Sequence, residues 1–516
     1  MTRHFTVLPL ALLVLSAASA ADRPKDGPNV LFVMADDLNT HLGCYGEVPP
    51  PTPNLDRLAA ESVQFEHAYC QYPSCGPSRA SLMTGRRPNA TKVYINETDF
   101  RDALPDVVTL PQLFRENGYH TARVGKIFHM GVPGDIGTSG RDDEVSWDEV
   151  RNPIGVDRLY VDQIVQYEPA GGMKRATGWA DLPDDSGRHT DQLVTEQAID
   201  LMRDHRSEPF FLAVGYFRPH FPFVAPHSCF EKVRFDRVLL PVEPAGHLKQ
   251  ILPAARMYPP HYGLAEEQVR RIKRAYLASI AFVDAEIGKL LEGLKEADPT
   301  RETIVILTSD HGFNLGEHGH WQKGSLWEES LRVPLLIRRP NEPSAGAVCR
   351  ATVELVDLYP TVAELAGLPT RSPMDGESLV PLLDDPQQDW PHPAYSMLQP
   401  VNKGRIGYSV RSGDWHYIQW QGEQPGGQLF RHSGDPHEWN NLAESPEYAA
   451  EVEQMQQLLK REQRAVPPDE EALRRQATFP PDVPGWREDW LAYKAQQKKA
   501  HQAYLRRARQ EPAANR

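Results

Sequence analysis

Residues 73–88 contain a cysteine, Cys75, at the start of a predicted helix, a position that can change the reactivity of its thiol. Cys75 is followed by Pro77 and Arg79 and then by an apolar run that predicts a helix. Ser74 is expected to cap that helix, and Pro77 fits its first turn, where a backbone N–H has no intrahelical partner. A helix start favours anions, and Arg79 adds a forked positive charge. We therefore expect a lowered pKa for the Cys75 thiol and a nucleophilic role, with a buried structural cysteine as the alternative.

Polar side chains follow the ends of several predicted buried strands. The strands are short runs rich in strand-forming residues, at 29–34, 119–124, 209–216 and 303–308. The residues at or just beyond their ends are, in the same order, Asp36 with Asp37, Lys126, His220, and Asp310 with His311. Because ligands bind outside the carboxyl ends of parallel strands, we expect these residues to share one site.

Part of this set has the donors of a metal site. Asp36, Asp37, Asp310 and His311 supply oxygen and nitrogen ligands for one divalent cation. Mostly carboxylate ligation favours a hard ion such as Ca²⁺ over zinc. A solvated turn is the alternative for the Asp36-Asp37 pair alone. The second polar pair, after another buried strand, favours the metal site.

The remaining pattern places these strands in an α/β domain. Helices are predicted at 52–60 and 110–116, a long amphipathic helix covers 269–294, and another strand covers 333–337. This alternation predicts a mostly parallel sheet. Residues 131–190, rich in Gly, Pro and Asp, are expected to form a cleft wall or a lid.

The pattern changes at about residue 386. Strands at 408–411 and 415–420 and a helix at 447–463 predict a smaller C-terminal α+β subdomain, followed by a Pro-rich connection at 467–484 and a polar helix at 489–509. The expected divisions are a signal peptide (1–20), a catalytic domain (21–385) and the C-terminal subdomain with its terminal helix (386–516).

Composition narrows the class of protein. The formal charge of −14 over 516 residues, without a basic stripe, argues against general nucleic-acid binding. Residues 1–20 have the charged start, apolar core and small-residue end of a signal peptide, and no later run is long enough for a membrane anchor. We expect a secreted or periplasmic protein, or a lysosomal one in a eukaryote. If Cys75 is consumed chemically, four cysteines remain, enough for two disulfides.

The sequence resembles the type I sulfatases. The resemblance rests on Cys75, Pro77, Ser78, Arg79, Thr84 and Gly85, on residues 32–38, 124–126 and 308–312, and on a C-terminal motif at 429–442. Within the family it is most similar to the iduronate-2-sulfatase subfamily, through residues 84–88, 118–119, 124–129, 211–216 with 219–220, and 316–319 with Lys323. The resemblance implies an alkaline-phosphatase-like fold, with a large mixed, mostly parallel sheet between helices.

The resemblance also implies a cofactor and a nucleophile. In the family a formylglycine-generating enzyme oxidises the cysteine to formylglycine, whose hydrate attacks the sulfur of a sulfate ester. One Ca²⁺ per chain is then held by Asp36, Asp37, Cys75 as formylglycine, Asp310 and His311.

The same resemblance implies roles for the other polar residues. Arg79 and Lys126 stabilise the hydrate and the anion, and His129 is the expected base that releases sulfate. Asp310 helps to activate the attacking hydroxyl.

His220 and Lys323 are implied to hold sulfate oxygens and assist the leaving group. Taken singly, the lysines and histidines also fit surface or structural roles. His318 and His320 are expected behind the site or at the surface, and residues 435–442 are expected to close a turn.

The substrate implied is a sulfated saccharide, with a 2-O-sulfated uronic acid favoured. Another carbohydrate sulfatase and a choline sulfatase are alternatives. A phosphatase or phosphonate hydrolase of the same superfamily is the nearest rival, although alkaline phosphatases favour Ser or Thr as nucleophile. A catalytically inactive glycan-binding protein is the alternative from another class.

Overall fold

The computed structural model describes residues 27–47, 50–158, 163–168, 174–297, 300–371, 373–400 and 403–478. The expected signal peptide (1–20) and terminal helix (489–509) lie outside these residues. Within the described ranges, no helix has the length and apolar character needed to cross a membrane.

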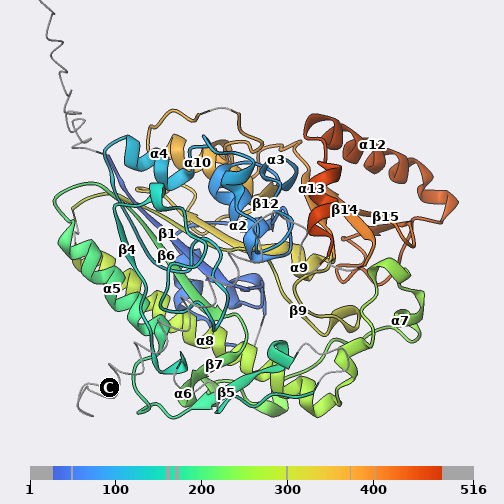
Figure 1. The fold of residues 1–516 in the computed structure, drawn as a ribbon, viewed down its shortest axis with the longest axis horizontal. Helices are drawn as coiled ribbons and strands as arrows, with labels where there is room; N and C mark the ends of the chain where they lie inside the picture. Colours follow the sequence, from blue (N-terminus) through green and yellow to red (C-terminus); the bar gives the residue numbers. More distant parts are fainter. Residues whose placement is uncertain are drawn as a thin grey trace, which may run out of the picture.

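An eight-stranded sheet forms the centre of the molecule (Figure 1). In spatial order its strands are β12 (Val348–Glu354), β2 (Val63–Tyr69), β11 (Arg332–Arg338), β8 (Thr303–Ser309), β1 (Asn29–Asp36), β6 (Phe210–Pro219), β3 (His120–Gly125) and β4 (Glu149–Arg151). Neighbouring strands are parallel except around β11, which is antiparallel to both β2 and β8. The predicted mixed, mostly parallel sheet is confirmed.

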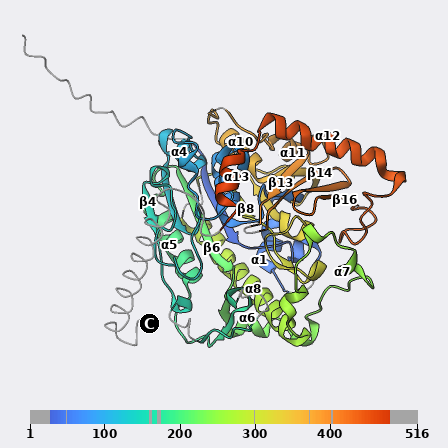
Figure 2. The ribbon, with the colours of Figure 1, turned by 45° about the vertical axis from the view of Figure 1, so that its right-hand side comes forward.

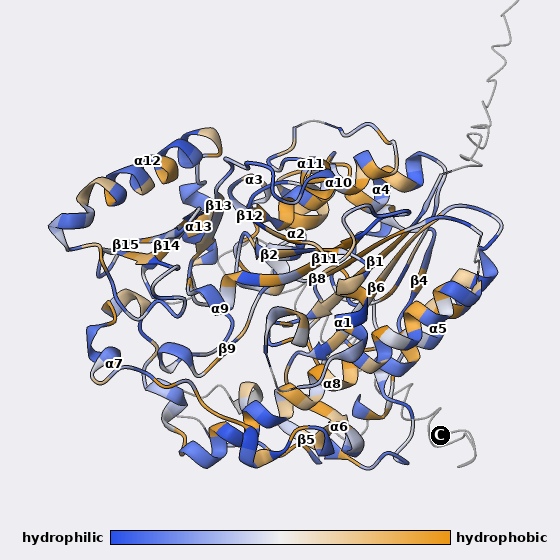
Figure 3. Ribbon diagram, turned by 180° about the vertical axis from the view of Figure 1, so that it is seen from behind, coloured by the Kyte–Doolittle hydropathy of each residue, from blue (hydrophilic) through white to orange (hydrophobic). Residues whose placement is uncertain are grey.

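Both faces of β1 are buried, because alternate side chains enter two different apolar cores. Val30 and Phe32 pack in the core beneath α4 (Leu110–Glu116) and α10 (Leu358–Leu365). Leu31 and Val33 pack in the core beneath α1 (Pro53–Ala60), α5 (Thr190–Asp204) and α8 (Glu266–Ala297). The central strands are accordingly largely hydrophobic in Figure 3.

The other short elements connect this framework. They are α2 (Cys75–Thr84), α3 (Pro88–Thr91), β5 (Trp179–Leu182), β7 (Phe223–Pro226), α6 (His227–Glu231), α7 (His247–Gln250), β9 (Asn314–Leu315), β10 (Trp321–Gln322), α9 (Glu328–Leu331) and α11 (Val380–Asp384). The sequence predicted β1 and β6 too short, since they extend to Asp36 and Pro219. The predicted Pro-rich connection was wrong over part of its length, because it contains helix α13 (Glu470–Gln476).

A smaller antiparallel sheet follows in the C-terminal part. Its strands are β13 (Ala394–Leu398), β14 (Arg405–Ser412), β15 (Trp415–Gly422) and β16 (Gly426–Arg431). Helix α12 (Ala449–Ala465) lies along it (Figure 2). The predicted antiparallel subdomain is therefore present, and its boundary at residues 385/386 stays a prediction.

Buried polar contacts hold the small sheet against the large one. Arg411 of β14 donates to the Tyr69 hydroxyl at 2.8 Å, and that hydroxyl donates to Glu328 at 2.9 Å. The Ser396 hydroxyl donates to the carbonyl of Cys70 at 2.6 Å. Because residue 70 lies just before α2, these contacts position the small sheet beside the segment that carries Cys75.

Candidate active site

Cys75 is the first residue of α2, as predicted, but the helix start is capped differently from the prediction. Ser74 occupies the N-cap position without a capping bond from its side chain. Its hydroxyl donates instead to Asn96 Oδ1 at 3.1 Å, and the same oxygen accepts the Gly76 N–H at 2.8 Å. A Cβ on Gly76 would lie 2.8 Å from the Asn96 Cα, so this glycine permits the close approach. Asn96 begins a glycosylation sequon at residues 96–98, and no role at the helix start was predicted for it from the sequence.

The carboxyl ends of β1 and β8 meet beside Cys75. Asp37 turns the chain after β1 with a left-handed φ of 64°, a conformation that non-glycine residues rarely adopt. Ser309, to which the sequence assigned no role, holds the turn: its hydroxyl accepts the Leu38 N–H and donates to the Ala35 carbonyl, both at 2.9 Å. The two predicted acidic pairs are thereby brought together.

A buried ion-pair network lies beneath them. Arg79 donates to Asp310 Oδ2 at 2.8 Å and to Asp36 Oδ1 at 3.0 Å, while Lys126 Nζ donates to Asp36 Oδ2 at 2.6 Å. All four side chains are fully buried. Burial raises the pKa of Asp310, but the charges of Arg79 and Lys126 outweigh it and hold that pKa well below its usual value. Arg79 therefore positions two carboxylates and adds positive charge beneath Cys75.

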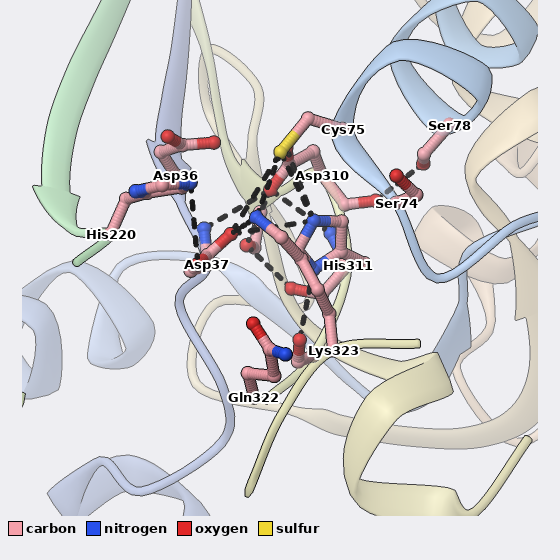
Figure 4. Close-up of polar contacts among 12 residues, drawn as sticks. Asp36, Asp37, Ser74, Cys75, Ser78, His220, Asp310, His311, Gln322 and Lys323 are labelled. Atoms are coloured by element: carbon pink, nitrogen blue, oxygen red, sulfur yellow. Dashed lines mark hydrogen bonds and ion pairs between the residues drawn. The ribbon is translucent and has the colours of Figure 1, made fainter. Parts of the chain in front are cut away.

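The Cys75 sulfur faces three of the predicted residues (Figure 4). Lys323 Nζ lies 3.0 Å from the sulfur, His311 Nε2 lies 3.4 Å away, and Asp37 Oδ1 lies 3.9 Å away. Lys323 also donates to Asp37 Oδ1 at 2.5 Å. Lys323 follows β10 and is far from Cys75 in sequence, so tertiary structure brings the two side chains together.

The predicted lowering of the Cys75 pKa is wrong. Burial raises the pKa of the thiol to about 12, because the loss of solvent outweighs the attraction of Lys126 and Lys323. Asp36 and Asp310 raise it further. At neutral pH the group is a thiol rather than a thiolate, so it is a poor nucleophile as cysteine.

His311 and His220 present unprotonated nitrogens to the site. His311 Nδ1 lies 2.9 Å from the Gly312 carbonyl and His220 Nδ1 lies 2.5 Å from the Phe221 carbonyl. A carbonyl only accepts, so each Nδ1 carries the hydrogen and each Nε2 keeps its lone pair. Burial lowers the pKa of both rings, which keeps them neutral. His220 Nε2 lies 3.8 Å from Asp37 Oδ2, inside the predicted group.

His129 lies beside the same cations. Burial lowers its pKa well below 6.5, and the charges of Lys126, Arg79 and Lys323 lower it further. Its Nδ1 is buried and has no hydrogen-bond partner among the described residues. The ring is therefore neutral, and its role as a base stays a prediction.

The donor set fits a divalent cation. Ligand atoms of Asp37, Cys75, Asp310 and His311 lie within 4.8 Å of one another, and so do those of Asp36, Asp37, Cys75 and His220. Asp37 Oδ2 is buried without a hydrogen-bond partner in the described part of the chain, so an acceptor is left for an ion. Three carboxylates and three Lys or Arg cations already balance, and a divalent ion would leave the site positive, as an anionic substrate requires.

A cavity of about 900 Å³ opens beside Lys323. Four of its lining residues, Arg256, Gln399, Arg405 and Trp420, are called the outer wall below. Residues 131–190 were predicted to form a cleft wall or lid, but no described residue of that segment lines this cavity. Parts of it pair instead as β4 and β5, at the sheet edge and in a two-stranded sheet.

The remaining predicted residues have structural partners. His318 is buried, stacks on Trp327 with ring centroids 3.8 Å apart, and contacts His247. His320 is also buried and bonds to the Ala255 carbonyl at 2.9 Å, so neither is a surface residue. Residues 435–442 close a turn as expected, with the Asp435 carboxylate accepting two backbone N–H groups.

The other cysteines and the sequons do not add to the site. All five cysteines are free, so the two disulfides allowed by the sequence do not form. The chain has glycosylation sequons at residues 89–91 and 96–98, and both asparagine side chains have partners. Asn89 donates to the Val466 carbonyl at 3.0 Å, and Asn96 Oδ1 accepts the Gly76 N–H.

Comparison with known proteins places this site in a family. Residues 28–368 match the sulfatase family model, and residues 316–465 match a model described as N-sulphoglucosamine sulphohydrolase, C-terminal. The chain belongs to the sulfatase family. Members of this family generally use a formylglycine and a divalent metal.

Individual relatives extend over most of the chain. A sulfatase of Formosa agariphila is 30% identical, covering 89% of this chain and 92% of that protein. Iduronate 2-sulfatase of Mus musculus is also 30% identical, covering 83% and 93%. The phosphonate monoester hydrolase of Agrobacterium radiobacter has the same fold, with a TM-score of 0.70 and 21% identity over 85% of this chain and 96% of that one.

Proposed function

We propose that this protein is an exported sulfatase that removes a 2-O-sulfate from a uronic acid of a sulfated glycan. The observation that carries the proposal is the position of the Cys75 sulfur, 3.0 Å from Lys323 Nζ and 3.4 Å from His311 Nε2, among buried carboxylates. The signal-peptide pattern of residues 1–20 supports export to a periplasm, to the medium or to a lysosome.

Cys75 is proposed to act as formylglycine, made by a formylglycine-generating enzyme. The raised pKa of the thiol supports this proposal, because an unmodified Cys75 would be mostly protonated at neutral pH. The hydrated aldehyde supplies two hydroxyls, one to attack sulfur and one whose deprotonation expels sulfate. One Ca²⁺, held by Asp36, Asp37, residue 75, Asp310 and His311, would neutralise sulfate charge, and the largely carboxylate donor set favours this ion.

The side chains divide the remaining work. Asp310 is proposed to help activate the attacking hydroxyl by accepting its hydrogen bond, and His129, kept neutral by burial, accepts the proton of the second hydroxyl. Arg79 and Lys126 hold the carboxylates in place and stabilise the negative charge of the hydrate.

Two further side chains are proposed to handle the ester. Lys323 donates to sulfate oxygens and stabilises the leaving alkoxide. His220, whose Nε2 faces Asp37, is placed to contact a sulfate oxygen.

The choice of substrate rests on the similarity to iduronate 2-sulfatase and on a cavity large enough for a disaccharide. The test is turnover of defined disaccharides carrying 2-O-, 6-O- or N-sulfate, beside choline sulfate, a phosphate monoester and a phosphonate monoester. Release of sulfate from the 2-O-sulfated uronate at the highest kcat/KM supports the proposal. Faster turnover of any other ester overturns the substrate choice.

The nucleophile is tested separately on the same preparation. Mass spectrometry of the tryptic peptide that contains residue 75 should find formylglycine, and Cys75→Ala should lose at least about 10⁴-fold in kcat. An unmodified thiol in active enzyme contradicts the nucleophile. An unmodified thiol in a protein that binds glycans without turnover supports the inactive binding protein instead.

A further inference from the structure

The outer wall of the cavity contains an arginine with no counter-charge. Arg405 begins β14, its guanidinium lies over the Trp420 ring at 5.4 Å from the centroid, and both residues line the cavity. Among the residues that the structure describes, Arg405 has no side-chain hydrogen bond and no ion pair, and its Nε is buried without an acceptor. A half-buried guanidinium without an acceptor is unfavourable unless a ligand supplies one.

Neighbouring polar groups are unsatisfied in the same way. Trp420 is 3% exposed, and its Nε1–H has no acceptor in the described ranges. Gln399 also lines the cavity, and its Oε1 is a buried acceptor without a donor among the described residues. Unpaired donors and an unpaired acceptor on one wall match the carboxylate, sulfate and hydroxyl groups of a charged sugar.

The charge of the cavity favours an anion as well. Its described lining contains the cations Arg256, Lys323, Lys403 and Arg405 and one carboxylate, Glu97. This excess of positive charge occurs in a chain with a net charge of −14. Burial without an opposing charge lowers the pKa of Arg405, as expected where no carboxylate lies close. Local potential therefore attracts polyanions to a protein that would repel them overall.

We propose that Arg405, oriented by Trp420, is a second anion-binding residue, which holds an oxyanion of the saccharide other than the sulfate ester that is cleaved. The inference rests on the proposed function for its substrate class. The planar fork of arginine can donate two parallel hydrogen bonds to a carboxylate or a sulfate, and stacking on the indole leaves the edge of the fork open. Arg405 thereby selects acidic saccharides over neutral sulfated ones.

Binding to full-length Cys75→Ala protein tests this without requiring turnover. The probes are a disaccharide with a 2-O-sulfated uronate and a second sulfate, the same disaccharide with its carboxyl reduced to an alcohol, and the same disaccharide without the second sulfate. Adding Arg405→Gln should raise the Kd of the complete disaccharide about 10- to 100-fold. Arg405→Lys should restore part of that loss because it keeps the charge without the fork.

The matched control is Arg431→Gln, an exposed arginine of the same sheet that pairs with Asp414 at 2.9 Å. Arg431→Gln should leave the Kd of the disaccharide equal to that of the Cys75→Ala protein. All variants should have the same thermal unfolding midpoint as the Cys75→Ala protein. An unchanged Kd in a folded Arg405→Gln protein overturns the proposal. If the loss disappears with the carboxyl-reduced probe, the partner is the carboxylate, and if it disappears with the probe that lacks the second sulfate, the partner is that sulfate.

Turnover by the active form separates this inference from the function on which it rests. Arg405→Gln should lose at least ten times more kcat/KM on the charged disaccharide than on a small aryl sulfate. Tight, Arg405-dependent binding without sulfate release by the wild-type enzyme leaves the subsite standing and refutes the sulfatase proposal. Release of sulfate that does not depend on Arg405 supports the sulfatase proposal and refutes the subsite.

Discussion

The buried site around Cys75 and the outer wall of the neighbouring cavity treat charge in opposite ways. Beneath Cys75, Arg79 bridges Asp36 and Asp310, and Lys126 bonds the second oxygen of Asp36, all out of solvent. On the outer wall, Arg405 lacks any acceptor in the described part of the chain. The first arrangement fixes the positions of the carboxylates beside Cys75, and the second leaves hydrogen-bond donors available to a ligand.

The difference predicts how each side responds to mutation. Removal of a member of the buried network leaves an opposite charge uncompensated, so both folding and chemistry should suffer. Removal of the Arg405 guanidinium leaves no described group without its partner, so its cost should appear in ligand binding alone.

Arg79→Ala should have the largest effect. It leaves Asp36 and Asp310 buried without their guanidinium, so the free energy of unfolding should fall by about 3–5 kcal/mol and sulfatase turnover should be lost. Urea unfolding measures the first and sulfate release the second. Arg115→Ala removes an exposed pair with Asp148 and should change stability by less than about 1 kcal/mol. Equal losses of stability in Arg79→Ala and Arg115→Ala would show that the buried network is no more important for folding than an exposed ion pair.

Lys323→Met should reduce kcat about 10²- to 10³-fold, because it removes the ammonium that lies 3.0 Å from the Cys75 sulfur. The side chain is 13% exposed, so the loss in stability should be smaller than for Arg79→Ala. Lys289→Met, on the exposed side of α8, is the control and should keep full activity. A decrease below ten-fold would rule out Lys323 as a group that stabilises the transition state.

Buried neutral histidines should make the fold sensitive to acid. Burial lowers the pKa of His320 to about 4, while the unfolded chain titrates near 6.5. Below pH 6.5 the unfolded state therefore binds more protons, and the stability present above pH 6.5 is lost as pH falls toward 4. His320→Gln should recover up to about 3 kcal/mol of that loss. The measurement is the free energy of unfolding of both proteins at pH 6.5 and at pH 4.

The control for this titration is His227, whose pKa is raised by its bond to Asp181. That group contributes stability at low pH, so His227→Gln should not flatten the acid limb. If His320→Gln leaves the pH dependence unchanged, its ring is not held neutral in the folded protein.

Asn96→Ala should have the smallest effect. It removes the acceptor of the Gly76 N–H at the start of α2, with an expected loss of about 1 kcal/mol. Because α2 carries Cys75, kcat should fall modestly as well. Asn96→Asp keeps an acceptor oxygen at a helix start and should restore stability. A full loss of activity without a loss of stability would instead place Asn96 in contact with substrate.

The sequence predicted the fold wherever local pattern and topology agreed. Runs of strand-forming residues predict β1, β3, β6 and β8. The rule that ligands bind at the carboxyl ends of parallel strands then groups six residues, Asp36, Asp37, Lys126, His220, Asp310 and His311. The antiparallel direction of β11 was not predicted, because strand direction depends on the path of the chain between strands rather than on the residues within them.

The sequence by itself determined which polar side chains lie together at the carboxyl ends of the strands, because parallel strands bring these ends to the same edge of a sheet. Tertiary structure decided the electrostatics and the walls. The helix-start argument predicted an acidic thiol, and burial reversed it, since desolvation depends on neighbours that are distant in sequence. Asn96 reached the start of α2 from the segment after α3, and Arg405 and Trp420 reached the cavity through packing of the small sheet. No local sequence pattern encodes either contact.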